Sequence, residues 1–414
     1  MSHDIFFGRQ PILDARGALI GYELLFRDRA NQSQAVVTDQ TQATATVITH
    51  AFCQLGIAEA LGHTRAFINV DKDFLHHDAI ELLPANKVVI EVLEHGEITA
   101  EVIERCRYLK QRGYTIALDD IIHLPEPARP ILDIVDIIKV DLALLDDDAL
   151  AALVTQLKAW PAATLLAEKV ETREQMERCR ILGFQLFQGY FFARPALVSG
   201  RRLNPAQTTL LRLTNLLAQD AENDEIETAF KQEPALTLNL LRITNSVGMG
   251  LANKITSIRS AITMLGRRQL QRWLQLLLYA DPQRPDASAN PLLLLAATRG
   301  RHMELLVQHL RPRDRNGADL AFMTGIMSLM PSVFQAPMQE ILTQITVADE
   351  VQVALLERAG EVGALLNLTE AAEGSTEQRV AELLARTPNL DWDALASTLT
   401  HAMQWARLLD VSEG

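Results

Sequence analysis

The first half of the chain alternates short β-rich runs with amphipathic helical stretches, a pattern typical of α/β proteins. Eight runs have the length and residue content of strands: Ile5–Phe7, Gly21–Phe26, Ala66–Val70, Val88–Leu93, Thr115–Leu118, Ile137–Val140, Thr164–Ala167 and Phe184–Phe187. Eight strands with helices between them predict a TIM-like (β/α)₈ barrel, in which reactive groups lie at the C-terminal ends of the strands.

Glycines mark the ends of two of the predicted helices. Val102–Arg112 is followed by Gly113, and Arg173–Leu182 is followed by Gly183. A glycine just past a helix adopts the left-handed conformation of a C-cap, which lets the chain turn into the next strand. The alternation of helix and strand is therefore expected to continue to the end of the first half.

The second half has a different pattern, because strand signals disappear after about residue 203 and a helical period takes over. The stretch Ala196–Pro205 predicts a linker. We therefore expect an α/β barrel over residues 1–200 and an all-helical domain, with a C-terminal helical extension, over residues 201–414. The length of 414 residues agrees with two domains, since it exceeds that of one ordinary hydrophobic core.

Acidic and amide side chains stand at the ends of most of the predicted strands. They are Glu23, Asn69, Glu91, Asp119, Asp120, Asp141 and Glu168, joined by Lys139 and Gln188. Carboxylates that one sheet brings together repel one another, so the folded protein must offset their charge with divalent ions or with a lysine. The series therefore predicts a metal and phosphate site.

Composition narrows the classes of function. The net charge of −13 argues against a general nucleic-acid binder, whose affinity depends on lysine and arginine neutralising phosphates. The three cysteines are far apart, which gives no zinc signal and fits a reducing cytoplasm. The N-terminal residues lack the layout of a signal peptide, and the longest apolar runs are much shorter than a membrane span. We expect a cytoplasmic protein without a membrane or nucleic-acid partner.

Several short motifs follow one another in a fixed order. They are Gln10-Pro11-Ile12, Glu23-Leu24-Leu25-Phe26-Arg27, Phe67-Ile68-Asn69, Glu91-Val92-Leu93-Glu94, Leu118-Asp119-Asp120, Ile138-Lys139-Val140-Asp141, Ala167-Glu168-Lys169-Val170-Glu171, Gln188-Gly189-Tyr190 and Arg194-Pro195. This succession resembles the EAL domain, the cyclic di-GMP phosphodiesterase family, whose usual forms include EAL-x-R, ExTE, DDFGTG, KID, AEGVE and QGY. Each motif alone is weak, but all of them in order make a specific resemblance.

The resemblance implies three groups of site residues. The metal ligands are Glu23, Asn69, Glu91, Asp119 and Asp120. The catalytic residues are Asp120, Lys139, Glu168 and Gln188. The residues on the substrate side are Gln10, Arg27, Asp141 and Glu171. All-oxygen ligands suit Mg²⁺ or Mn²⁺, and two such ions would clamp the scissile phosphate and activate a water molecule.

The chain departs from the family in three places. Where the family has the glycine-hinged loop FGTG after Asp119-Asp120, this chain reads Ile121-Ile122-His123-Leu124-Pro125, without a glycine to adopt positive φ. Leu93 replaces the threonine of ExTE, and Lys169 replaces the glycine of AEGVE. Changes around metal ligands typically cost about 10–100-fold in metal affinity or activity, so we expect weak or absent hydrolysis with retained ligand affinity. We interpret His123 as a loop side chain that faces water.

The second half resembles the HDOD domain, a helical relative of HD-type phosphohydrolases, over roughly residues 200–370. The resemblance rests on Glu233–Ser246, Ile255–Ile262 and Leu265-Gly266. An active HD enzyme carries adjacent His-Asp metal ligands on a helix, whereas Ser328-Leu329 stand at the comparable place here. The resemblance implies a domain that is not an enzyme and that binds an unidentified protein. A second copy of the chain is another candidate partner.

Three functions stay open from the sequence. The first is a signalling adaptor of the cyclic di-GMP network, whose barrel binds the nucleotide with weak or no hydrolysis. The second is a metal-dependent phosphodiesterase that opens cyclic di-GMP to the linear dinucleotide pGpG. The third is a scaffold that binds no nucleotide. Preserved ligand positions beside an altered loop favour the first function.

Overall fold

The structure, a computed structural model, describes residues 5–28, 61–93, 98–124, 129–192, 205–232, 236–237, 240, 257–279, 291–374 and 377–407. The chain divides into two compact units. The first comprises Met1–Arg194, Asp286–Leu294 and Asn367–Gly414, and the second comprises Pro195–Pro285 and Leu295–Leu366. The predicted linker Ala196–Pro205 lies, except for Pro205, outside the described residues. The domain boundary at about residue 200 stays a prediction.

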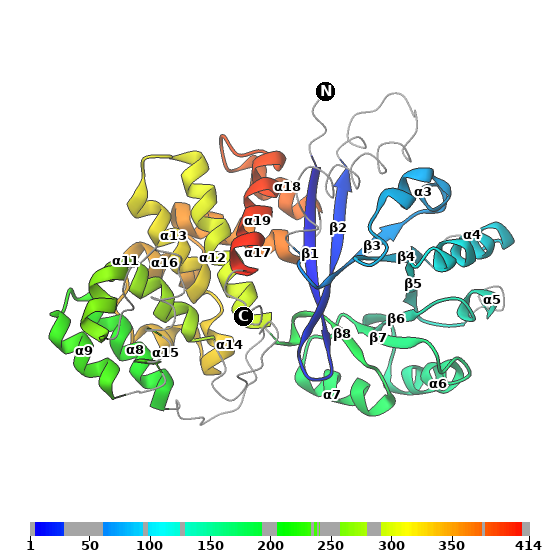
Figure 1. Ribbon diagram of the computed structural model, residues 1–414, viewed down its shortest axis with the longest axis horizontal. Helices are drawn as coiled ribbons and strands as arrows, with labels where there is room; N and C mark the ends of the chain where they lie inside the picture. The colour runs from blue at the N-terminus through cyan, green and yellow to red at the C-terminus, as the bar shows by residue number, and fades with distance from the viewer. Residues whose placement is uncertain are drawn as a thin grey trace. The chain divides into compact units, whose positions relative to one another are not determined.

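Eight strands close into a barrel in the order of the sequence (Figure 1). They are β1 (Ile5–Asp14), β2 (Leu19–Asp28), β3 (Arg65–Val70), β4 (Val88–Leu93), β5 (Thr115–Ile121), β6 (Ile137–Asp141), β7 (Thr164–Glu168) and β8 (Leu186–Gln188). Each of them overlaps one of the eight predicted strands, so the prediction of a TIM-like barrel is confirmed. β1 and β2 are longer than predicted because they form a hairpin.

The first strand runs against the direction of the others. β1 is antiparallel to both β2 and β8, whereas the remaining neighbours are parallel. The connection between Asp14 and Leu19 is a tight turn, which can join antiparallel strands but is too short for the crossover that parallel strands need. This reversal was not predicted from the sequence.

Short helices connect the parallel strands. They are α3 (Lys72–His76), α4 (Ala100–Gln111), α5 (Arg129–Leu132), α6 (Asp147–Leu157) and α7 (Arg173–Leu182), with 3₁₀ segments η2 (Asp78–Leu82) and η4 (Leu142–Leu144). A third 3₁₀ segment, η5 (Tyr190–Phe192), follows β8. The two helix ends predicted from glycines are confirmed. Gly113 and Gly183 have φ angles of 93° and 113°, and they lead the chain from α4 into β5 and from α7 towards β8.

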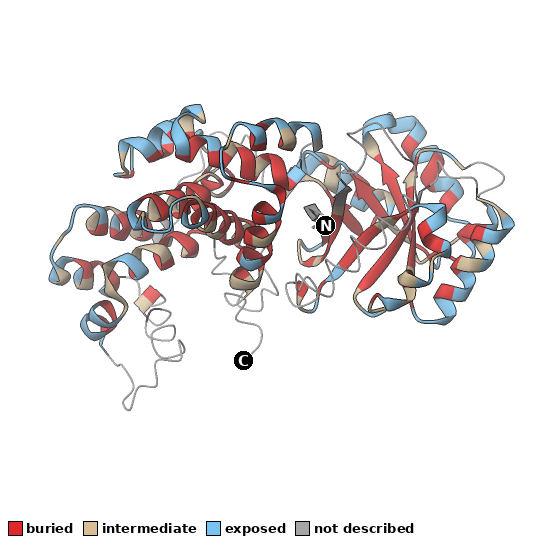
Figure 2. Ribbon diagram, turned by 90° about the horizontal axis from the view of Figure 1, so that it is seen from above, coloured by how far each residue is buried: buried red, intermediate tan, exposed pale blue. Residues whose placement is uncertain are grey.

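The interior of the barrel is built in layers. Seven inward-facing apolar residues form a buried plug: Ile12, Phe67, Val89, Ala117, Ile137, Leu166 and Leu186. Because side chains alternate along a strand, the residue two positions further on each parallel strand faces inward again. Those residues are Asn69, Glu91, Asp119, Lys139, Glu168 and Gln188. A polar layer therefore lies on the plug at the C-terminal strand ends, and Figure 2 shows how much of the strands is buried.

All regular elements described from residue 205 onward are helices, which confirms the prediction of a helical second half. They are α8 (Pro205–Ala218), α9 (Asn223–Lys231), α11 (Ile258–Leu277), α12 (Pro291–Leu310), α13 (Arg315–Met327), α14 (Met330–Phe334), α15 (Met338–Leu342), α16 (Asp349–Glu357), α17 (Gly360–Gly374), α18 (Glu377–Ala385) and α19 (Trp392–Arg407). Gly266 kinks α11 with a φ of 74°. Most of Glu233–Ser246 lies outside the described residues.

One helical stretch, Arg315–Phe334, is long and apolar enough to cross a membrane by length and composition alone. It spans α13 and α14, and the sequence analysis did not single it out. Within its most apolar window, 61% of the residues are buried inside the protein. The core helix of a protein without any membrane span passes the same test, so this stretch is weak evidence of a span.

The last helix packs beside the first strand. α19 contacts β1, and both belong to the first unit. Ten of the 16 residues of α19 are buried, which is too many for one face of a surface helix and indicates neighbours on more than one side. The C-terminal segment therefore belongs with the barrel by its contacts, although it lies in the half of the sequence that was expected to form the helical domain.

Replacing Leu395 and Met403 of α19 by alanine is expected to loosen β1. Both side chains are buried, and each truncation typically costs about 2–5 kcal/mol of stability because it leaves a cavity. Hydrogen exchange followed by mass spectrometry should show faster exchange of the β1 amides. His401→Ala, at an exposed position of the same helix, should leave β1 unchanged. Unaltered β1 exchange in the double variant would contradict the packing.

Candidate metal centre

A buried lysine stands at the centre of the polar layer. Lys139 Nζ lies 2.5 Å from Glu91 Oε1, 2.8 Å from Asp119 Oδ1, 3.0 Å from Glu168 Oε1 and 3.4 Å from Glu23 Oε2. The lysine side chain is 0% exposed. Strands β2, β4, β5, β6 and β7 thus each contribute one charged side chain to a single point, as the sequence analysis expected for offset carboxylate charge.

Glu23 is also fixed by two amides. Its Oε1 accepts a hydrogen bond from Asn69 Nδ2 at 2.8 Å, and its Oε2 accepts one from Gln188 Nε2 at 2.6 Å. Gln188 Nε2 also donates to Gln10 Oε1 at 2.7 Å. Side-chain hydrogen bonds therefore connect β1 and β8 to β2 in addition to the backbone hydrogen bonds between strands. They hold the Glu23 carboxylate in the mouth of the barrel.

A bulge presents the two adjacent aspartates. The pairing of β5 with β6 shifts register between Leu118 and Ile121, and Asp120 adopts a left-handed φ of 54°. Bulges beside active sites re-aim side chains in this manner, and a left-handed non-glycine residue costs of the order of 1 kcal/mol or more. Asp119 Oδ1 accepts the Asp120 N–H at 3.0 Å. Both carboxylates consequently lie at the same strand end.

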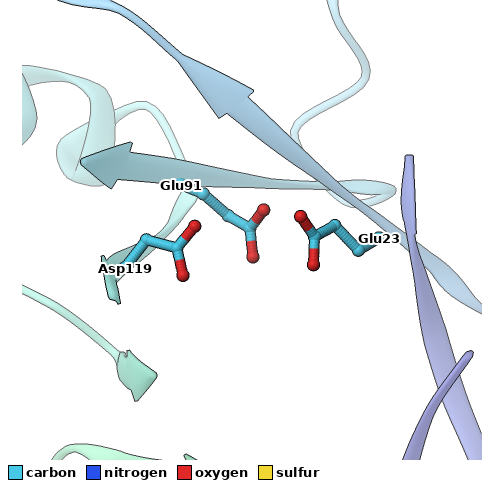
Figure 3. Close-up of side chains that lie close together, drawn as sticks. All are labelled: Glu23, Glu91 and Asp119. Atoms are coloured by element: carbon cyan, nitrogen blue, oxygen red, sulfur yellow. The ribbon is translucent and has the colours of Figure 1, made fainter. Parts of the chain in front are cut away.

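The oxygen atoms form two overlapping sets that can hold cations. Ligand atoms of Glu23, Glu91 and Asp119 lie within 4.8 Å of one another, and the same is true of Asp119, Asp120 and Glu168. Figure 3 shows the carboxylates of Glu23, Glu91 and Asp119 gathered together, each coming from a different strand. Asp119 belongs to both sets. The arrangement suits two neighbouring ions that share one carboxylate.

Several buried oxygens in this layer have no hydrogen-bond partner among the described residues. They are Asn69 Oδ1, Glu91 Oε2, Glu168 Oε2 and Gln188 Oε1. A buried acceptor without a partner is costly, and a bound ion or water satisfies it. Oxygen donors without any sulfur or imidazole are the set that Mg²⁺, Mn²⁺ and Ca²⁺ prefer. The residues present therefore fit a divalent ion.

The pKa values indicate a shortage of positive charge in the metal-free site. Burial raises the pKa of Glu91 well above its usual value, and the neighbouring Glu23 and Asp119 add to this, although Lys139 opposes it. Burial likewise raises the pKa of Glu168 from 4.5 to about 8 against the opposing effect of Lys139. Burial lowers the pKa of Lys139, but the four carboxylates outweigh it and raise the value well above the usual one.

The end of β8 depends on a glycine. Gly189 has a φ of 142°, and a β-carbon at this position would overlap the backbone of Val170. Val170 N–H donates to the Gln188 carbonyl at 2.9 Å, so the segment after β7 crosses directly over the end of β8. This close approach holds the Gln188 side chain at the mouth, and it gives a physical reason for glycine in the Gln188-Gly189-Tyr190 motif.

Three further predicted residues occupy different environments. Asp141, at the end of β6, is 1% exposed and its Oδ1 accepts the Ala143 N–H at 2.8 Å. Glu171 is exposed at the start of α7, where its N–H donates to Gln175 Oε1. Arg27 lies in β2, but its side chain is outside the described part of the structure. The same holds for the side chain of Leu93 and for Pro125, two of the departures from the family pattern. The roles assigned to all these residues stay predictions.

One contact of the site was missed from the sequence. The ammonium of Lys169 forms an ion pair with Asp141 Oδ2. The departure from AEGVE drew attention to Lys169, but its partner depends on the pairing of β6 with β7, which places Asp141 opposite Glu168. His123, which follows β5, is exposed and belongs to neither of the two sets of candidate ligands among the described residues.

The helical half has an arginine where an HD enzyme would need metal ligands. Ser328 Oγ accepts a hydrogen bond from the Arg299 guanidinium at 2.7 Å and donates to the Gly325 carbonyl at 2.6 Å. Arg299 is buried. A guanidinium at this place repels a metal cation, so the local charge opposes a metal site around Ser328.

Comparisons with known proteins identify two domain families in the chain. The model of the EAL domain matches residues 4–195, and the model of the HDOD domain matches residues 203–402. The chain is 30% identical over 406 residues to the cyclic di-GMP phosphodiesterase CdgJ of Vibrio cholerae, covering 97% of this chain and 92% of that one. It is 29% identical to the uncharacterized protein YuxH of Bacillus subtilis, covering 98% of both chains.

Solved structures with a similar part include BlrP1 of Klebsiella pneumoniae in complex with manganese and cyclic di-GMP. That match has 25% identity and a TM-score of 0.38, and it covers 45% of this chain and 55% of the other, about half of its length. The Bacillus subtilis YkuI protein, bound to cyclic di-GMP and calcium, matches with 21% identity and a TM-score of 0.38, covering 63% of this chain and 71% of the other.

Replacing Lys139 by methionine is expected to destabilise the metal-free protein. The change leaves four buried carboxylates without their ammonium partner, and breaking a buried ion pair typically costs about 3–5 kcal/mol. Urea unfolding at pH 8 in the presence of a chelator measures the loss. The loss should shrink at pH 5, where the carboxylates take up protons, and Lys158→Met, at an exposed position on the end of α6, should have little effect.

The stability of the metal-free protein is expected to fall as the pH rises from about 5 to about 8. Glu168, with its pKa raised to about 8, holds a proton in the folded state that the unfolded chain has released above pH 4.5. Its contribution to the slope is at most about 1.4 kcal/mol per pH unit. Unfolding curves at several pH values, compared with Glu168→Gln, isolate that contribution. An equal slope in both proteins would contradict it.

Proposed function

This chain belongs to the family of proteins that join an EAL domain to an HDOD domain, and on that premise we propose that its barrel binds cyclic di-GMP together with Mg²⁺ or Mn²⁺ and hydrolyses it weakly. The observation that carries the proposal is the convergence of four carboxylates and two amides on the mouth of the barrel around Lys139. A dianionic nucleotide would not approach such a mouth unless cations were bound there.

Each side chain has a task that follows from its contacts. Glu23, Asn69, Glu91 and Asp119 would hold one ion, and Asp120 with Glu168 would help to hold a second one beside Asp119. Bound divalent ions polarise a phosphate and lower the pKa of a water molecule. Lys139 keeps the carboxylates in place before an ion arrives, and its ammonium can donate to a water molecule in the mouth. Gln188 keeps Glu23 oriented.

The segment after Asp120 supports the proposal of weak hydrolysis. β5 continues to Ile121, which is fully buried and pairs with Val140, so the chain is anchored where the family has a glycine-hinged loop. Residues 121–124 contain no glycine. A segment that is anchored in a strand at its first residue and has no glycine would follow the substrate less readily than a hinged loop, and closure over the reacting phosphate would be impaired.

A fully active phosphodiesterase is the second candidate function. It is favoured by the complete donor set and by the relative CdgJ, which carries that name and matches almost the whole chain. Under this reading the barrel would release pGpG at a rate that the altered segment does not limit.

For the helical half we propose a binding function towards another protein. The Arg299–Ser328 contact opposes a metal-dependent hydrolase at that place, and the rest of the proposal is an analogy to the HDOD family. In this reading the nucleotide state of the barrel is passed on as a protein interaction.

Calorimetry with cyclic di-GMP is expected to show binding that requires Mg²⁺ or Mn²⁺ and disappears with a chelator. Glu23→Gln should weaken it by about 10–100-fold or more, because that change removes one ligand charge. Product analysis should show slow formation of pGpG by the original chain. Ile122→Gly with Leu124→Gly, which restores both glycines of the family loop, should accelerate it.

The outcomes separate the candidates. Absence of binding heat with every metal ion would refute cyclic di-GMP as the ligand. Rapid turnover by the original chain, with no gain from the two glycines, would instead establish the second candidate. Turnover that survives Glu23→Gln would come from a contaminating enzyme.

A further inference from the structure

Lys169 occupies an unusual backbone position at the edge of the candidate metal centre. It follows Glu168, the last residue of β7, and has a left-handed φ of 54°. Glycine adopts this conformation freely, whereas a lysine is strained in it. The EAL motif has a glycine at this point, so the lysine is a specific property of this chain and its side chain has to be explained by its contacts.

The lysine side chain points to the end of β6, where it meets Asp141. Its ammonium pairs with Oδ2 of Asp141, which is almost fully buried, while 58% of the lysine side chain is exposed. The other Asp141 oxygen is already held by the Ala143 N–H, so the carboxylate is fixed and the ammonium with it. Asp141 is paired with Glu168 across β6 and β7. A positive charge is thus fixed beside the end of β7.

This charge acts mainly on one of the two sets of ligands. Burial lowers the pKa of Lys169, but the hydrogen bond and charge of Asp141, followed by the charges of Asp120 and Glu168, raise it above its usual value. Asp120 and Glu168 belong, with Asp119, to the second set of candidate ligands, which does not include Glu23 or Glu91. A cation bound by that set would be held in part by Glu168, the neighbour of Lys169 in the chain, whereas Glu23 and Glu91 lie on β2 and β4.

We propose that Lys169 lowers the affinity of the Asp119–Asp120–Glu168 set for a divalent ion, so that the barrel binds its two ions with widely separated affinities. The inference rests on the proposed metal-dependent function. The physical cause is the repulsion between a fixed ammonium and a divalent ion in the same partly buried mouth, together with the loss of Asp141 as a free anion. At low metal concentration the barrel then holds one ion, and the second one enters only when the concentration is high.

Binding of Mn²⁺ alone to the full chain tests the proposal, by calorimetry and by electron paramagnetic resonance of the free ion. The original chain should bind one ion tightly and a second one at least about tenfold more weakly. Lys169→Gly, which relieves the backbone strain and therefore should fold, is expected to tighten the second ion about 10–100-fold and to leave the first unchanged. Lys169→Arg, which keeps the charge, should behave like the original chain.

A control for general charge effects is Lys158→Gln, at an exposed position on the end of α6, which should change neither affinity. Two ions of equal affinity in the original chain would overturn the proposal. It would also fall if Lys169→Gly left the second ion unchanged, if both ions tightened equally, or if Lys169→Arg matched the glycine variant.

The failure of this inference is distinguishable from the failure of the proposed function. Separated Mn²⁺ affinities without any binding of cyclic di-GMP would keep the role of Lys169 and refute the nucleotide ligand. Metal-dependent binding of cyclic di-GMP with two equal ions would do the reverse. No Mn²⁺ binding by the original chain or by Lys169→Gly would refute the role of Lys169.

Discussion

The barrel depends on one buried ammonium group. Among the described residues, Lys139 is the only positively charged side chain that forms ion pairs with Glu23, Glu91, Asp119 and Glu168. All five side chains are buried. Burying charges is expensive unless each is paired, so the five strands that supply them must meet in the correct register. One ammonium does not balance four carboxylates, and burial, together with the repulsion of neighbouring carboxylates, raises the pKa of Glu91 and Glu168.

The shortage of positive charge links the stability of the barrel to the proposed binding of metal ions. A layer of acids on top of an apolar plug is stable without metal only if some of the acids keep their protons. Divalent ions remove that requirement, because they supply the missing charge and satisfy the buried oxygens of Asn69 and Glu168. In the proposed metal-bound state, the cost that the fold bears without metal would become a driving force for the binding of cations.

Much of the barrel could be predicted because the sequence shows both the alternation of residues along the strands and the glycines at the helix ends. Alternation with a period of two places Val89 in the plug and Glu91 in the mouth, and glycines such as Gly183 end the helices between the strands. The ring of polar residues then follows from the rule that parallel strand ends meet at one edge.

What could not be predicted depends on pairing between distant segments. The Asp141–Lys169 pair requires the register of β6 against β7, which neither strand reveals alone. The reversal of β1 is decided by the short turn after Asp14. The bulge at Asp120 arises in the pairing with β6, and the contact of α19 with β1 joins residues from opposite ends of the sequence.

That last contact has a consequence for biosynthesis. β1 is synthesised long before α19, so the strand emerges from the ribosome without the helix that packs beside it in the folded protein. Domains usually fold in the order in which they are made, but here the barrel unit includes a helix that follows the intervening helical unit in the sequence. During synthesis the side of β1 that α19 covers therefore stays exposed until the helix has been made.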